Sequence, residues 1–254
     1  MKSFYKGFIV CICCLGCHML GAQIVNIEGS RLEQDSLGWQ GSAGLNFSYT
    51  QNINKFFIIK AHTGLQYRVG KHIILSLNDL NLVFSSTQNF NFSGFQHLRY
   101  NYLVNNWYTA EGFNQWQFDR VQKVQFRYLT GIGQRFTVYK KTKGRVHIGT
   151  AAMYEHEEEG GSDIHHNDLR LSNYLSATYR PSDGFSGTFM MYYQPLVYRF
   201  SDYRVSTLLN LFFRYNKYIS FTTGFSMAYD SNPVKDPKVV KLVFSVNQGL
   251  FLKF

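Results

Sequence analysis

Apolar and polar residues alternate with a period of two along most of this chain, and this pattern constrains its fold more than any other feature. In residues 239–254 apolar side chains fall mainly at even positions and polar ones at odd positions. Residues 39–50 show the alternation most regularly, and one face there would carry Trp39, Gly41, Ala43, Leu45, Phe47 and Tyr49. Because successive side chains of a β-strand point to opposite faces, the pattern predicts strands with one apolar and one polar face.

The alternation recurs in separate segments from residue 39 onward, which gives about twelve strands, and single-chain bacterial barrels need an even number. Aromatic residues make up 17% of the chain and there are only four prolines, which suits strands with one lipid-facing and one wet side. The joins also alternate in length, as in barrels with short periplasmic turns and longer outside loops. The expected short joins are 70, 104–106, 141–144, 181–183 and 216–217, and the expected long ones are 86–91, 155–168 and 230–237.

Together these patterns predict an all-β fold, a transmembrane antiparallel up-and-down β-barrel over residues 38–254 with both of its ends on the periplasmic side. A soluble β-sandwich is the alternative, and the alternation of join lengths disfavours it. Within residues 71–85 the parity of the apolar residues switches across Asn78 and Asp79, which predicts a β-bulge. No segment after the first 22 residues approaches 18 consecutive apolar residues, so no transmembrane helix is expected.

The first 22 residues have the order of a secretory signal peptide: two lysines, an apolar run over residues 7–20, and the small pair Gly21-Ala22. We expect cleavage after Ala22, followed by a periplasmic lead-in over residues 23–37. A lipoprotein would instead be cleaved before Cys17, but Cys14 occupies the position where such a site has an aliphatic residue. All four cysteines lie in this leader, so the mature chain is expected to form no disulfide.

A closing strand that ends on Phe254 resembles those of bacterial outer-membrane proteins, in which the terminal aromatic residue belongs to the signal for the barrel-insertion machinery. Short motifs in the middle of the chain resemble domain-of-unknown-function family 481, the salt-induced outer-membrane proteins. They occupy residues 97–101, 111–115, 127–133, 202–204 and 229–233. The resemblance implies a barrel in the outer membrane of a Gram-negative bacterium, surrounded by lipid and lipopolysaccharide. Its activity would be unestablished, and no catalytic residues come with it.

The polar faces of the expected strands carry many cations and few acids. The predicted lumen charge network consists of Lys60, Arg68, Arg99, Glu111, Arg127, Arg135, Arg145, Arg170, Arg204 and Arg214. One interpretation is a narrow interior in which every charge has a partner, with Glu111 neutralising Arg99 and Arg127. The other is a basic, water-filled lumen that favours anions, and the two can coexist. Bulky residues expected to point inward would narrow the lumen: Trp107, Phe113, Tyr174, Tyr192 and Phe212.

Residues 155–168, expected to form the longest outside loop, are dense in carboxylates and imidazoles. Glu155, His156, His165 and His166 are weak candidates for ligands of a divalent cation, although solvated acidic loops are commoner.

An enzyme that acts at the lipid-facing wall would need a serine and a histidine next to each other on that wall. The alternation of the strands places no such pair on the outer face. We therefore expect a small passive pore or structural barrel, anion-preferring if open, that is not an enzyme, needs no cofactor and binds no nucleic acid. The alternatives are an outer-membrane enzyme acting on lipid or lipopolysaccharide, and an adhesive or structural barrel without transport.

Overall fold

The computed structural model describes residues 37–51, 55–85, 91–237 and 239–252. The expected signal peptide, residues 23–36 of the lead-in and Phe254 lie outside these ranges, so the expectations for them stay predictions. The described residues form twelve strands: β1 Gly38–Gln51, β2 Lys55–Val69, β3 His72–Ser85, β4 Asn91–Leu103, β5 Tyr108–Asp119, β6 Val124–Lys141, β7 Gly144–Glu159, β8 His165–Ser182, β9 Phe185–Leu196, β10 Arg199–Arg214, β11 Ile219–Asp230 and β12 Leu242–Leu252.

All twelve strands belong to one sheet in which each strand pairs with its neighbours in the sequence, and every pair is antiparallel. This confirms the predicted all-β, up-and-down fold and its number of strands. No helix in the described part of the chain is long and apolar enough to cross a membrane.

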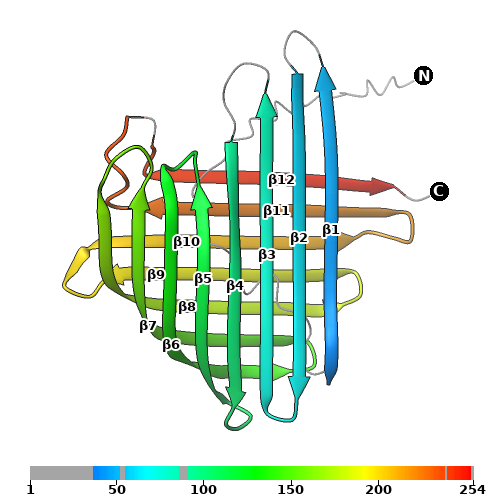
Figure 1. The fold of residues 1–254 in the computed structure, drawn as a ribbon. Coiled ribbons are helices and arrows are strands. Elements are labelled where there is room, and N and C mark those ends of the chain that lie inside the picture. The colour runs from blue at the N-terminus through cyan, green and yellow to red at the C-terminus, as the bar shows by residue number, and fades with distance from the viewer. Residues whose placement is uncertain (1–36, 52–54, 86–90, 238, 253–254) are drawn as a thin grey trace, which may run out of the picture.

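The sheet folds over on itself (Figure 1). Strands β1 to β5 run along one direction, β8 to β12 cross behind them, and β6 and β7 curve from one layer into the other. Among the described residues no backbone ladder joins β1 to β12, so the expected closure of the barrel is not seen. Side chains bridge the interior instead: Tyr174 of β8 donates a hydrogen bond to Glu111 of β5, with 2.9 Å between the two oxygens.

The outer face of the sheet is apolar and exposed. Trp39, Phe47 and Ile132 have exposed fractions of 68%, 60% and 76%. Neighbouring strands place aromatic rings side by side on this face, as in the row Phe47, Phe57 and Phe84, whose ring centroids are 6.5 and 6.0 Å apart. An exposed apolar surface on strand after strand is unusual for a protein in water and typical of the lipid-facing wall of a barrel.

The inner face is polar over most strands but also holds two apolar clusters. Leu75 and Leu77 are buried against Phe95, and Tyr174 packs with Met190, Tyr192 and Leu208. Gly149 makes room for the second cluster, because a Cβ at this position would overlap the ring of Tyr174 on the neighbouring strand. This close approach is what lets the Tyr174 hydroxyl reach Glu111 across the interior.

The bulge predicted at Asn78 and Asp79 is wrong. The register of β3 with β2 and with β4 is continuous through both residues. The parity switch has another cause: Leu75 and Leu77 fill the inner face, whereas farther along the strand the apolar residues lie on the outer face. Register shifts occur elsewhere, for example between Arg199 and Tyr203 of β10.

The joins agree only in part with the sequence expectation. Those after the even-numbered strands are short, and they lie at residues 70–71, 104–107, 142–143, 183–184 and 215–218. We call the edge of the sheet that carries them the short-turn end. At the opposite end the prediction of a long loop over 155–168 is wrong, because β7 continues to Glu159 and β8 begins at His165, leaving only residues 160–164. The longest join there is residues 231–241.

Candidate functional site

A buried carboxylate, Glu155, organises the interior near the end opposite the short turns. Its side chain is 1% exposed and contacts three guanidinium groups. The Nε atoms of Arg127 and Arg170 lie 3.1 and 2.8 Å from its oxygens, and Nη1 of Arg204 donates to Oε1. A charge buried this deeply is tolerated only when it is paired, and here one carboxylate is paired three times.

Further carboxylates surround the same three arginines. Glu157 lies 2.6 Å from Arg127 Nη2 and 3.1 Å from Arg204 Nη2. Asp202 accepts from Arg170 at 3.0 Å and Asp230 accepts from Arg204 at 2.9 Å. We call the set Arg127, Glu155, Glu157, Arg170, Asp202, Arg204 and Asp230 the Glu155 cluster. It includes strands β6, β7, β8, β10 and β11, so it ties the curving strands β6 and β7 to the layer that β8 to β12 form.

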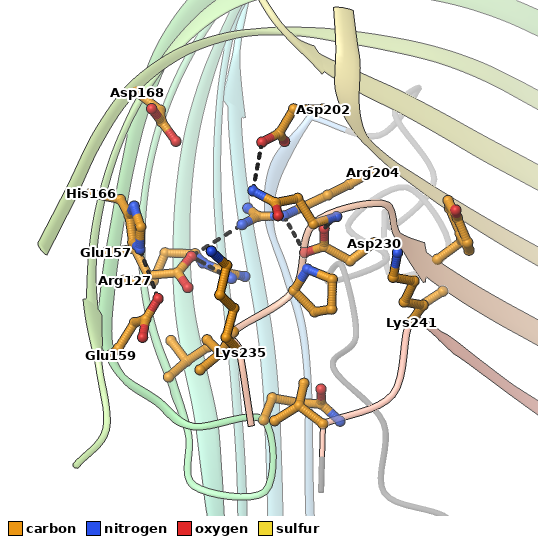
Figure 2. A pocket seen from close by; sticks show the side chains of 18 of the residues that line it. Arg127, Glu157, Glu159, His166, Asp168, Asp202, Arg204, Asp230, Lys235 and Lys241 are labelled. Atoms are coloured by element: carbon orange, nitrogen blue, oxygen red, sulfur yellow. Dashed lines mark hydrogen bonds and ion pairs between the residues drawn. The ribbon is translucent and has the colours of Figure 1, made fainter. Parts of the chain in front are cut away.

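Every member of the Glu155 cluster except Glu155 itself lines a cavity of about 380 Å³, which we call the mouth cavity (Figure 2). Lys235 of the longest join and Lys241 face the cluster across the cavity. The charges of its lining nearly balance, with six cations against five carboxylates. The cations are Arg127, Arg170, Arg199, Arg204, Lys235 and Lys241, and the carboxylates are Glu157, Glu159, Asp168, Asp202 and Asp230.

Tyr198 lies at the rim of the mouth cavity in the join between β9 and β10. Its hydroxyl donates a hydrogen bond to the carboxylate of Asp168. Because this bond stabilises the protonated phenol beside a negative charge, it raises the pKa of Tyr198 above its usual value. Tyr198 is therefore a hydrogen-bond donor at neutral pH and offers no base to the cavity.

A second set of charges occupies the middle of the inner face, around Glu111. Its oxygens lie 3.5 Å from Arg99 Nη1 and 3.4 Å from Arg135 Nε, and they accept the hydrogen bond from Tyr174. Arg99 also donates to His97 at 3.2 Å. We call Arg99, Glu111, Arg135 and Tyr174 the Glu111 cluster. These four side chains are almost fully buried, so this level of the interior is filled by side chains.

The inner face at the short-turn end holds a cavity of about 410 Å³ with a different character, which we call the basic cavity. Five cationic side chains line it, with His147 beside them, and no aspartate or glutamate is among its described lining residues. The cations are Arg68, Lys71, Arg135, Lys140 and Arg145. The basic cavity and the mouth cavity share no lining residue, and the Glu111 cluster supplies Arg135 to the basic cavity.

Eight of the ten residues predicted for the lumen network fall into these three groups. Arg99, Glu111 and Arg135 form one cluster, Arg127, Arg170 and Arg204 belong to the other, and Arg68 and Arg145 line the basic cavity. Lys60 and Arg214 are exposed and belong to none of them. The predicted pairing of Glu111 with Arg127 is wrong, because Arg127 pairs with Glu155 and Glu157 one strand further on.

Sequence reasoning missed Glu157, Asp202 and Asp230. The loop predicted over residues 155–168 includes Glu157, although Glu157 keeps the parity of Glu155 and the same alternation places it on the inner face. Asp202 and Asp230 belong to motifs at residues 202–204 and 229–233, which are far apart in the sequence and meet in the Glu155 cluster. Trp107, expected to point inward, is 58% exposed in a short turn and stacks on Phe136, with 6.0 Å between ring centroids.

The four weak metal candidates do not form a group. Glu155 is engaged with the three arginines, and His166 faces the mouth cavity with its Nε2 2.7 Å from an oxygen of Glu159. His156 lies on the outer face, where it neighbours His165 and a residue that was not a candidate, Glu158. The strand alternation separates the predicted set, because residues 155 and 156 point to opposite faces of β7.

Comparisons with known proteins add a family but no activity. None of the curated proteins matches this chain. The NanC porin, in a rhombohedral crystal form, is similar in structure at 9% identity, with a TM-score of 0.46 over 84% of this chain and 99% of that chain. OccK11 (OpdR) of Pseudomonas aeruginosa is similar at 9% identity, with a TM-score of 0.34 over 84% of this chain and 79% of that one. Structural similarity this weak gives no information on the activity or the substrate of this protein.

A family model matches residues 58–250, which run from β2 into β12 and contain both charge clusters and the basic cavity. The motifs that carry the resemblance in the sequence lie within this range. The chain belongs to the family described as "Protein of unknown function, DUF481".

Proposed function

We propose that this protein is a narrow outer-membrane β-barrel that passes small anions by passive diffusion. The exposed apolar face supports the membrane setting, because water would solvate such a surface poorly and lipid would not. The polar inner face supports a solvent-accessible interior at both ends of the sheet, where the mouth cavity and the basic cavity lie.

The basic cavity is the observation that carries the anion preference. The mouth cavity is nearly neutral, whereas five cations line the basic cavity of about 410 Å³ with no carboxylate in its described lining; one of the five, Arg135, is paired with Glu111 from outside that lining. A cavity that is lined by charges of one sign and has low-dielectric walls focuses the electric field of those charges. The field raises the concentration of oppositely charged ions in the cavity. Rings of Arg and Lys select anions in other pores for the same reason.

The interior between the two cavities argues for a small conductance. Tyr174 and Tyr192 are buried in one apolar cluster, and the Glu111 cluster fills the same level with paired charges. An interior of this kind lies closer to small barrels filled by side chains than to wide porins with an aqueous channel.

Planar bilayers test the proposal through ion selectivity. Under a KCl gradient at low salt, the wild-type reversal potential should shift towards that of chloride. The double variant Lys140→Gln/Arg145→Gln, which removes two charges from the basic cavity, should reduce this shift. Lys60→Gln/Arg214→Gln is the matched control, since it removes two charges from outside both clusters and should leave the selectivity nearly unchanged. Equal effects of the two double variants would overturn the role of the basic cavity.

A sealed structural barrel is the second candidate, and the threefold pairing of Glu155 favours it. Charges held in this way fasten strands to one another and do not need a permeant ion. Absence of conductance from protein that is correctly inserted would support this candidate over the pore.

A further inference from the structure

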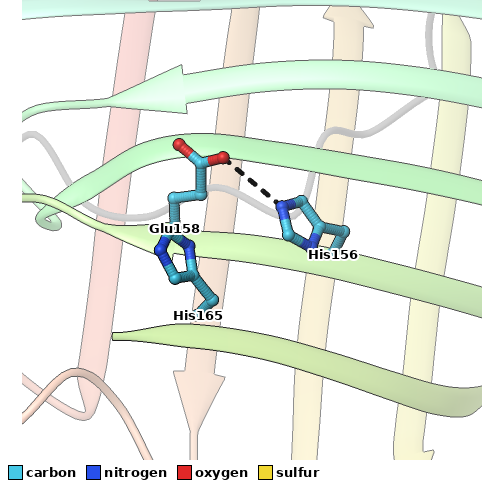
Figure 3. A group of neighbouring side chains, drawn as sticks. All are labelled: His156, Glu158 and His165. Atoms are coloured by element: carbon cyan, nitrogen blue, oxygen red, sulfur yellow. Dashed lines mark hydrogen bonds and ion pairs between the residues drawn. The ribbon is translucent and has the colours of Figure 1, made fainter. Parts of the chain in front are cut away.

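Two histidines and a glutamate gather on the outer wall of the protein (Figure 3). His156 and Glu158 are two residues apart on β7 and so point to the same face, and the register places His165 of β8 directly opposite Glu158. One possible ligand atom from each of the three residues lies within 4.8 Å of the other two. We propose that His156, Glu158 and His165 bind a divalent transition-metal ion.

The hydrogen bonds of His156 prepare its second ring nitrogen for a metal. Nδ1 lies 2.8 Å from Oδ1 of Asn167, and the Tyr154 hydroxyl donates to the same oxygen at 2.8 Å. Because an amide oxygen only accepts, Nδ1 of His156 carries the proton and a neutral ring has its lone pair on Nε2. Histidines that ligate metals are commonly oriented in this way by a hydrogen bond from the other nitrogen.

The second ring nitrogen of His156 faces the carboxylate of Glu158. Its Nε2 lies 3.4 Å from Oε1 of Glu158, as the dashed line in Figure 3 marks. Without a metal ion, a proton on Nε2 makes this contact an ion pair with the carboxylate, and a metal ion bound by both atoms would take the place of that proton. The ring of His165 lies nearly parallel to that of His156, with 6.2 Å between centroids and 8° between planes, and it supplies the third donor.

The donor set selects the class of ion. Two imidazole nitrogens and one carboxylate oxygen suit Zn²⁺, Ni²⁺ and Cu²⁺, whereas Ca²⁺ and Mg²⁺ prefer a shell of oxygen ligands. Three protein ligands on an accessible wall leave a coordination position for water or for a group from outside.

The site lies at the margin of the apolar outer face. On β7 the outward residues up to Tyr154 are apolar except Thr150, and His156 and Glu158 follow. On β8 His165 and Asn167 precede the apolar residues that begin at Leu169. The three ligands are therefore next to the join 160–164, on the outer wall, and the sheet separates them from the mouth cavity that Glu157 and His166 line on its other face. Metal binding here is independent of the proposed anion pathway.

The test uses purified protein without a histidine tag, in detergent and free of metal. Calorimetric titration with Zn²⁺ should show one site in the wild type, and Cu²⁺ at one equivalent should give an electron paramagnetic resonance spectrum with splitting from two nitrogens. His156→Gln/His165→Gln should abolish both signals. Asn167→Leu, which leaves all three ligands in place, should weaken Zn²⁺ binding by about 10- to 100-fold.

His72→Gln/His166→Gln is the matched control, because it also removes two histidines but leaves the proposed ligands intact. It should bind Zn²⁺ like the wild type. Full Zn²⁺ binding by His156→Gln/His165→Gln would overturn the assignment, and so would a wild type that binds no Zn²⁺.

Discussion

Replacing Glu155 by glutamine removes the negative charge at the centre of the Glu155 cluster while keeping the shape of the side chain. Breaking a buried ion pair from one side costs about 3–5 kcal/mol. Here each arginine keeps another carboxylate: Arg127 keeps Glu157, Arg170 keeps Asp202, and Arg204 keeps Glu157 and Asp230. We therefore expect the lower end of that range, a loss of about 3 kcal/mol in the free energy of unfolding.

Urea unfolding in lipid vesicles, followed by tryptophan fluorescence, measures this loss. Glu158→Gln is the matched control, since it makes the same chemical change three residues along β7 on the exposed outer face. In metal-free buffer we expect the control to change stability by less than about 0.5 kcal/mol. Equal stability of Glu155→Gln and the wild type would mean that the arginines are solvated by water, which would refute a dry, charge-paired interior.

Three further changes probe other parts of the structure by the same unfolding assay. Glu111→Ala should cost about 3–5 kcal/mol, because it leaves Arg99 and Arg135 buried without the carboxylate that they share. Gly149→Ala should cost about 1–3 kcal/mol as the new methyl group displaces the Tyr174 ring, and a neutral result would contradict the packing described here. Ile132→Lys should cost about 2–4 kcal/mol in vesicles if Ile132 faces the middle of the bilayer; no change would argue that this face is not in lipid.

The strands and their two faces were predictable because a period of two is a direct consequence of strand geometry. Trp39, Leu45 and Phe47 lie outward and Gln66, Arg99 and Arg135 lie inward, as their parity predicts. The number of strands and the short turns follow from the same pattern, since most interruptions of the alternation coincide with a change of direction; the parity switch inside β3 is an exception.

Partners across the interior were not predictable, because they depend on the stagger of the strands and on the curvature of the sheet. Arg204 on β10 reaches Glu155 on β7, and nothing in the local sequence of either strand specifies this meeting. Local composition gave a wrong prediction as well. The many charges of residues 155–159 indicated a loop, although these residues belong to β7 and every second one of them lies on the inner face. The parity switch in β3 indicated a bulge, whereas the apolar residues of that strand lie on the inner face before Asn78 and on the outer face after Asp79.

Placement of the apolar outer face in a lipid bilayer is the central claim, and the native tryptophans test it directly. All three, Trp39, Trp107 and Trp116, lie outside the interior, with exposed fractions of 68%, 58% and 40%. In vesicles of lipids with brominated acyl chains, the account predicts strong quenching of tryptophan emission relative to vesicles of the unbrominated lipid. Equal emission in the two kinds of vesicle, with the protein recovered in solution, would contradict it.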